Sequence, residues 1–157
     1  RIALESRAHR PRRGKQNMLA IPSMLVTAGV TILAVIFYIV TGIRVGRTRE
    51  KHNIVAPAVS GHLEFERAYR VQMNTLEAMP VFLPALWIAT YYFTKVPLLA
   101  PALGLVWIVG RIIYMQAYMA DPAKRSLGFT IATLSQIALL LLAIAGLVMS
   151  WHSTTSA

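Results

Sequence analysis

Cysteine is absent from this 157-residue chain. Its absence excludes a disulfide framework, a thiol nucleophile and a cysteine-ligated metal site, and it leaves the redox compartment of the protein open. Any reactive sulfur in the chemistry of this protein must therefore come from a ligand.

Charged residues are also scarce. They make up 14% of the chain, whereas 56% of the residues are hydrophobic and the mean hydropathy is +0.55. An ordinary soluble domain has about 25% charged residues and could not bury this much apolar surface. The composition therefore predicts an integral membrane protein.

Acidic residues are the rarest charged group, with six Asp and Glu against sixteen Lys and Arg, which gives a net charge of +10. Half of this charge lies in residues 1–17, where Glu5 is the lone acidic residue and no apolar periodicity is present. We interpret residues 1–17 as a tail, either disordered or left over from an expression vector, and assign the membrane domain to residues 18–157. The remainder has no module that combines aromatic and basic residues, so nucleic-acid binding is not expected.

The apolar runs predict four helices that cross a membrane, since about 20 residues are needed to span the hydrocarbon. We expect these spans at about 19–43, 64–94, 98–120 and 125–151, with a polar loop over residues 44–62. The second span carries charges and contains Pro80 and Pro84, which a bundle tolerates when neighbouring helices satisfy the freed carbonyls. The predicted fold is all-α, an integral membrane four-helix bundle.

Basic residues gather in two of the connections, residues 44–62 and 121–125, whereas the opposite turn holds only Lys95. The positive-inside rule places these two connections on the cytoplasmic side. No secretory signal is recognisable, and no retention signal ends the chain. We therefore favour a bacterial inner membrane, with an endoplasmic-reticulum-type membrane as the alternative.

Polar residues inside the predicted spans form two stripes at helical spacing. Ionisable side chains are costly at membrane depth and usually face a cavity or a partner, which makes both stripes candidates for a functional site. The second span carries Arg67, Arg70, Asn74 and Glu77, and the third carries Arg111, Tyr114 and Tyr118.

A simpler, structural interpretation competes with a ligand site. Glu77 is the only acidic residue that we expect to be buried in a span, and it could neutralise Arg111 to hold the bundle together. One ion pair needs two side chains, however, and the stripes offer further donors that suit an anionic ligand. We predict no metal site, because His62, Glu64 and Glu66 alternate at a helix start and do not converge.

Two segments resemble one known family. The run EFERAYRVQMNTLEAMP, from Glu64 to Pro80, resembles the signature of the MAPEG family, the membrane-associated proteins of eicosanoid and glutathione metabolism. The run GRIIYMQAY, from Gly110 to Tyr118, followed by Lys-Arg-Ser at 124–126, is similar to the third helix and the start of the fourth in the same family. The resemblance extends over roughly Met18–Trp151, which includes all four predicted spans.

This resemblance implies a four-helix protomer that assembles as a homotrimer and binds glutathione between adjacent subunits, near the cytoplasmic face. Gln72 matches a position that the neighbouring subunit contributes, and Arg47 competes with Arg44 as the match of a ligand-facing arginine. Arg125 matches the arginine held against the glutathione sulfur, and Ser126 matches an adjacent serine considered catalytic in the prostaglandin synthase branch. The positions that match glutathione contacts or polar sites of the family are Arg44, Arg70, Gln72, Asn74, Glu77, Arg111, Tyr114 and Tyr118.

The chain departs from two branches of the family. Ala78 follows Glu77 where the leukotriene C4 synthase branch has a tyrosine, so one ligand contact is missing. Gln72 and Met73 stand where the prostaglandin E synthase branch has a histidine and an arginine. Both differences argue against these two specificities.

The activity implied by the resemblance is that of a membrane-bound glutathione transferase with a role in detoxification, which could also reduce lipid hydroperoxides as a glutathione peroxidase. A free thiol has a pKa of about 8.5, and a nearby guanidinium favours the reactive thiolate. We assign this role to Arg125 and expect a lipophilic second substrate to enter from the bilayer. The alternatives are a non-enzymatic lipid-binding scaffold of the same family, a prostaglandin E synthase-like isomerase, or a small transporter or channel. No inverted repeat is evident to support the transporter or channel.

Overall fold

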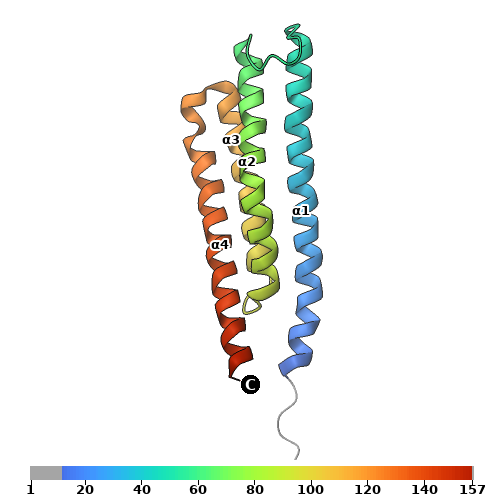
Figure 1. Ribbon diagram of the computed structural model, residues 1–157, viewed down its shortest axis with the longest axis vertical. Helices are drawn as coiled ribbons and strands as arrows, with labels where there is room; N and C mark the ends of the chain where they lie inside the picture. Colours follow the sequence, from blue (N-terminus) through green and yellow to red (C-terminus); the bar gives the residue numbers. More distant parts are fainter. Residues whose placement is uncertain (1–11, 157) are drawn as a thin grey trace, which may run out of the picture.

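The computed structural model describes residues 12–156 of the chain, and side chains from residue 22 onward. Four long helices make up the fold: α1 (Arg12–Lys51), α2 (Leu63–Tyr92), α3 (Leu99–Ala120) and α4 (Ser126–Thr155), with a short 3-10 helix, η1 (Pro122–Arg125), before α4. They run side by side as an elongated bundle with α2 at its centre (Figure 1). The all-helical architecture predicted from the sequence is confirmed.

Helix α1 is longer than predicted at both ends. The sequence indicated a loop from Arg44, but the helix continues to Lys51, because Val45 and Thr48 are buried and Val45 packs with Phe65 of α2. The guanidinium of Arg49 also lies 4.6 Å from the centre of the Phe65 ring. At the other end α1 begins at Arg12, inside the predicted tail, whose residues 1–11 lie outside the described part of the chain.

The α1–α2 connection is held by polar contacts at one end of the bundle. The carboxylate of Glu64 accepts hydrogen bonds from Lys51 Nζ at 2.7 Å and contacts His52 Nε2 at 2.9 Å. These two partners lower the pKa of the Glu64 carboxyl to about 2. Gly61 has a φ of +138°, a conformation that only glycine adopts without strain, and it turns the chain into α2.

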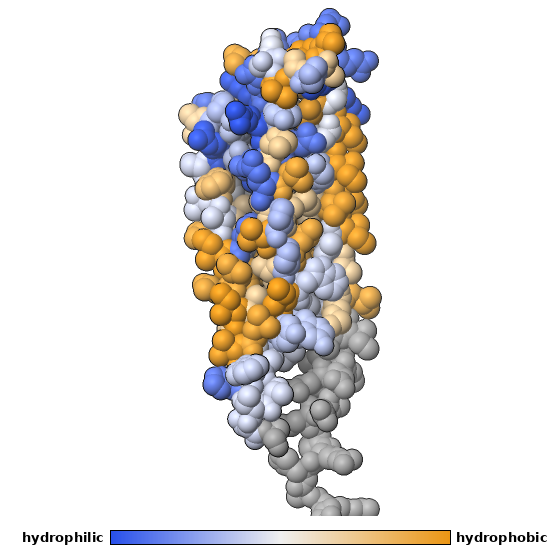
Figure 2. Space-filling model, viewed as in Figure 1, coloured by the Kyte–Doolittle hydropathy of each residue, from blue (hydrophilic) through white to orange (hydrophobic). Residues whose placement is uncertain are grey.

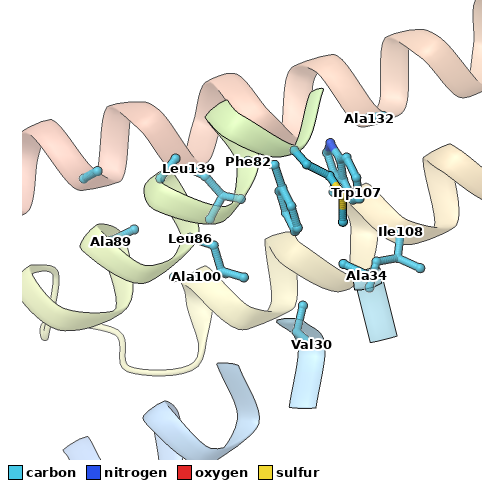
Figure 3. Close-up of a cluster of buried hydrophobic side chains, with 13 residues drawn as sticks. Val30, Ala34, Phe82, Leu86, Ala89, Ala100, Trp107, Ile108, Ala132 and Leu139 are labelled. Carbon is cyan, nitrogen blue, oxygen red and sulfur yellow. The ribbon is translucent and has the colours of Figure 1, made fainter. Parts of the chain in front are cut away.

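The apolar core lies between the helices in the half of the bundle away from that connection. Phe82 of α2 and Trp107 of α3 stack at its centre, with ring centroids 3.9 Å apart and planes 7° from parallel. Leu86 and Leu139 pack in the same core, and Val30 of α1 points into it (Figure 3). Pro80 and Pro84 lie inside α2 as predicted, and both are exposed.

Helices α3 and α4 approach most closely where two glycines replace side chains. A Cβ atom on Gly128 would overlap the backbone nitrogen of Tyr114. A Cβ atom on Gly110 would lie 2.7 Å from the backbone nitrogen of Ala132. Because neither clash involves a flexible side-chain end, this seam can form only with glycine at both positions.

The outer surface of the bundle is apolar over most of its length. Within the described part of the chain, three helical stretches are long and apolar enough to cross a membrane: Pro22–Lys51, Leu99–Ala120 and Pro122–Thr155. Figure 2 shows hydrophilic residues gathered at the end with the α1–α2 connection and η1, and hydrophobic residues over much of the surface below it. Helix α2 is the exception because its first half is charged, and its membrane crossing therefore stays a prediction.

Candidate functional site

Arg111 is the centre of the polar half of the bundle. It lies on α3 with 2% of its surface exposed. Its Nη1 donates to Asn74 Oδ1 at 2.9 Å, and its Nη2 donates to Thr75 Oγ1 at 2.7 Å. The Thr75 hydroxyl in turn donates to the Val71 carbonyl of its own helix at 2.7 Å. Two neutral oxygens therefore orient the guanidinium without cancelling its charge.

A carboxylate partner for Arg111 is not found among the described residues. The ion pair with Glu77, the structural alternative to a ligand site, does not form, and the Nε of Arg111 is buried without a hydrogen-bond partner in the described structure. Glu77 itself is exposed, so the expectation that it is buried was wrong for the single chain. A buried cation of this kind is costly unless it serves a bound anion or another specific role.

The predicted residues of α3 and the η1–α4 junction form a continuous row. The Arg111 guanidinium lies 4.5 Å from the centre of the Tyr114 ring, and the Tyr114 and Tyr118 rings are 5.4 Å apart. The row ends at Arg125, whose guanidinium lies 5.8 Å from the Tyr118 ring. Arg125 is exposed. Its Nη1 donates to the Pro122 carbonyl at 2.9 Å, which holds the guanidinium against η1.

A groove of about 250 Å³ opens at the Arg111 end of this row, between α2, α3 and α4. Its polar end is formed by Asn74, Glu77 and Arg111, and the rest is mostly apolar. Trp107 lies within the lining, where its indole Nε1 donates to Gln136 Oε1 at 3.1 Å. The remaining lining residues are Ala78, Val81, Phe129, Ala132, Thr133, Ile137 and Leu140.

Three of the predicted residues lie away from the row. Arg70 is exposed on α2 and Arg44 is exposed on α1, one turn before the exposed Arg47. Gln72 faces α1, where its Nε2 lies 3.0 Å from the position of a Cβ on Gly42. Because Gln72 and Asn74 are two positions apart on a helix, they point to different sides of α2. Ser126 is exposed at the start of α4, next to Arg125.

Arg67, which its spacing predicted to share the polar face of α2, contacts the end of α3 instead. Its Nη1 donates to the carbonyls of Met119 and Ala120, each at 3.1 Å. These are among the last carbonyls of α3, which lack partners within their own helix and carry partial negative charge. Arg67 therefore ties the end of α3 to α2, close to the turn that carries Arg125.

Three residues of the site escaped the sequence analysis. Trp107 continues the stripe of Arg111 one turn toward the start of α3, and extending the periodicity backward would have found it. Gln136 is an amide within an otherwise apolar helix, a recognised sign of a functional or packing contact in membranes. Thr75 gave no sequence signal, since threonines also occupy inner positions of α1 and α2 that have no link to this site.

Comparison with known proteins identifies the family. The sequence model of the MAPEG family matches residues 27–145. The chain belongs to the MAPEG family. Together with the apolar helices, this membership identifies an integral membrane protein.

Individual relatives are between 37% and 48% identical to this chain over the aligned residues. An uncharacterized protein of Synechocystis is 43% identical over 116 residues, which are 74% of this chain and 83% of that protein. Microsomal glutathione S-transferase 2 of Mus musculus is 48% identical over 89 residues, 57% of this chain and 59% of the mouse protein. Leukotriene C4 synthase of Cavia porcellus is 37% identical over 98 residues, 62% of this chain and 64% of that enzyme.

Proposed function

We propose that this protein is a membrane-bound glutathione transferase, which activates glutathione as its thiolate and conjugates it to lipophilic electrophiles. The same thiolate would also reduce lipid hydroperoxides to the alcohol and water, with a second glutathione completing the reaction to glutathione disulfide. The observation that carries the proposal is the row from buried Arg111 to exposed Arg125, whose Arg111 end lines a groove that is polar there and mostly apolar along the rest. Relatives named microsomal glutathione S-transferase 2 and leukotriene C4 synthase support glutathione as the ligand.

Glutathione carries two carboxylates, an ammonium group and a thiol, and the site offers a complementary group for each. Arginine and tyrosine are donors suited to carboxylates. Arg111 supplies an uncompensated positive charge, and Tyr114 and Tyr118 offer phenol groups along the same face of α3. Glu77, at the polar end of the groove, is placed to bind the ammonium group.

Arg125 is the residue that we assign to the thiolate. A free thiol with a pKa of about 8.5 is mostly protonated at neutral pH, and a guanidinium near the sulfur favours its ionised form. Arg125 is exposed at the end of the row, so its charge is accessible to a ligand that lies along the tyrosines. Ser126 adds a hydroxyl at the same junction and is the second candidate for a catalytic contact.

The apolar part of the groove suits the second substrate. Val81, Ile137 and Leu140 line it and are also exposed on the surface of the bundle that faces the hydrocarbon. A lipophilic molecule can therefore reach the groove sideways from the bilayer. Its reacting atom would lie past the polar end of the groove, toward Arg125, where the thiolate forms.

We infer that the complete site is formed by a homotrimer. Within one chain Arg44, Arg70 and Gln72 lie away from the row, so a glutathione bound along α3 needs a second copy to gain those contacts. The basic residues near η1 and at the end of α1 place this end of the bundle in the cytoplasm by the positive-inside rule. We propose a bacterial inner membrane as the location.

The proposal is tested by the ultraviolet absorbance of the thiolate. Glutathione is added at neutral pH to the detergent-purified protein, to Arg125→Ala and to Lys124→Ala. Lys124 is the matched control, because it is a neighbouring exposed cation of η1. We expect the thiolate difference signal in the wild type and in Lys124→Ala and its loss in Arg125→Ala. An undiminished signal in Arg125→Ala would refute the role of this residue, and no signal in the wild type would refute the proposed activity.

A further inference from the structure

A second cluster of chemically reactive side chains lies at the α1–α2 connection, apart from the glutathione site. His52 follows the end of α1, His62 is the N-cap residue of α2, and Glu64 lies in the first turn of α2. One ligand atom from each of the three side chains lies within 4.8 Å of the others. The two imidazole rings are stacked, with centroids 3.4 Å apart and planes 13° from parallel.

Spacing along the sequence does not reveal this cluster, because its residues are not all neighbours in the chain. His62, Glu64 and Glu66 alternate along the chain, and Glu66 indeed turns away to accept the backbone N–H of Gly61 at 3.0 Å. His52 is the third residue of the cluster instead, and it lies directly after the end of α1. Its arrival depends on the extension of α1 to Lys51 and on the turn at Gly61.

We propose that His52, His62 and Glu64 form a binding site for a zinc ion. Two imidazole nitrogens and one carboxylate oxygen are a ligand set that zinc accepts, with water in the fourth position of the tetrahedron. Ligand atoms of a tetrahedral zinc site are separated by about 3.3 Å, given zinc–ligand distances of about 2.0 Å. The cluster holds its atoms within 4.8 Å of one another, with His52 Nε2 and Glu64 Oε2 only 2.9 Å apart, at the hydrophilic end of the molecule that metal ions in water can reach (Figure 2).

Zinc would replace contacts that now hold the cluster together. Glu64 accepts from Lys51 Nζ, and the exposed ammonium can turn to water when the metal binds. His62 Nδ1 accepts the backbone N–H of Glu64 at 3.2 Å, a weak capping bond. Two imidazole rings that lie nearly parallel and in contact cannot both aim a nitrogen at one ion between them, so the exposed His62 ring must rotate to bring a nitrogen toward the ion. These changes involve exposed groups and leave the backbone in place.

A bound ion would join α1 to α2 directly. The ligands span the connection from residue 52 to residue 62, so the metal closes this loop at its base. Binding to the folded protein alone raises its thermal stability, by an amount that grows with the logarithm of the free metal concentration once this exceeds the dissociation constant. The inference does not depend on the proposed transferase activity, and its test uses no glutathione.

The test is a zinc titration of the full-length protein in detergent, purified with a tag that contains no histidine and freed of metal with a chelator. Calorimetry gives the number of ions and the affinity, and cobalt(II) substitution gives the visible absorption of a tetrahedral site. The variants are His52→Ala and His62→Asn, of which the second keeps a side chain that caps the helix. Glu66→Gln and His152→Ala are matched controls, since one lies beside the cluster and the other lies near the opposite end of the bundle.

We expect one zinc ion per chain, a cobalt spectrum typical of four ligands, and a melting temperature that rises with zinc. His52→Ala and His62→Asn should each weaken binding at least about tenfold, and the two controls should leave it unchanged. Circular dichroism of the metal-free variants shows that they are folded. The proposal is overturned by an absence of saturable binding in the wild type, or by wild-type affinity in folded His52→Ala or His62→Asn.

Discussion

The two halves of the bundle are built from the same helices but have different interiors. In the half near the α2–α3 turn, Phe82, Leu86 and Leu139 are fully buried and fill the centre with apolar atoms. In the half near η1, the corresponding place on α3 is taken by Arg111, with Thr75 and Tyr114 around it.

This difference separates what stabilises the protein from what it is suited to do. Apolar residues of similar volume at the position of a buried charge are often neutral or stabilising. A guanidinium that is held by two neutral oxygens and lacks a carboxylate partner is therefore poor evidence for a structural role. The apolar half supplies packing, and the polar half holds a buried cation whose charge is free to pair with an anion.

The largest effect is expected where α3 and α4 share a backbone contact within the polar half. Gly128→Ala places a methyl group against the backbone of Tyr114 and should separate α3 from α4 at the site. We expect a loss of about 4 kcal/mol in the free energy of unfolding and no measurable transferase activity. Thermal unfolding in detergent measures this, with Gly46→Ala as the control, because nothing lies within 4 Å of a Cβ at Gly46. Equal stability of the two variants would contradict the close seam.

Truncation within the apolar half should affect stability and spare the chemistry. Leu139→Ala removes a fully buried side chain, and we expect a loss of about 3 kcal/mol from the cavity that it leaves. Leu141→Ala is the control on the same helix, since Leu141 is 61% exposed. Denaturation in detergent gives the stability, and turnover per folded molecule should equal that of the wild type. A large loss of turnover in folded Leu139→Ala would show that the halves are not separable.

Replacement of the buried cation should have the opposite result. Arg111→Met keeps much of the side-chain volume, and we expect an unchanged or higher melting temperature. The catalytic efficiency, kcat/KM for glutathione, should fall about a hundredfold, equivalent to about 2.7 kcal/mol. Ile112→Met, at the next position and 36% exposed, controls for the new methionine. Marked destabilisation with full activity would identify Arg111 as a structural residue.

The smallest effect is expected from the hydroxyl that orients Arg111. Thr75→Val removes the bond to Arg111 Nη2 at nearly constant shape. We expect kcat/KM to fall about tenfold, equivalent to about 1.4 kcal/mol, because Asn74 still holds the other nitrogen. Thr75→Ser retains the hydroxyl and should restore most of the activity. If Ser and Val variants behave alike, the hydroxyl has no positioning role.

The sequence was sufficient for the helices because each is encoded locally. Apolar runs of more than about 20 residues predict a span by length alone, and polar residues at helical spacing identify the face of α3 that holds Arg111, Tyr114 and Tyr118. The approach of Arg125 to this face also follows, since η1 begins directly after α3.

The features that the sequence did not predict depend on contacts between helices, which the spacing of residues along the chain does not specify. Helix α1 continues beyond Arg44 because Val45 and Thr48 are buried in the folded bundle. Arg111 donates to Asn74 and Thr75 and not to Glu77, because α2 turns those two residues toward α3. The polar stripes of the two helices do not specify how the helices are rotated against each other. The cluster of His52 with His62 and Glu64 likewise needs the two helix ends to meet.

Direct binding of glutathione tests the central claim, that the polar half is a site for this ligand. Isothermal titration of the detergent-purified protein with glutathione, alongside Arg111→Met, requires no second substrate. We predict saturable binding to the wild type and at least about tenfold weaker binding to a folded Arg111→Met variant. Absence of binding to the wild type, or equal binding to both proteins, would contradict the account.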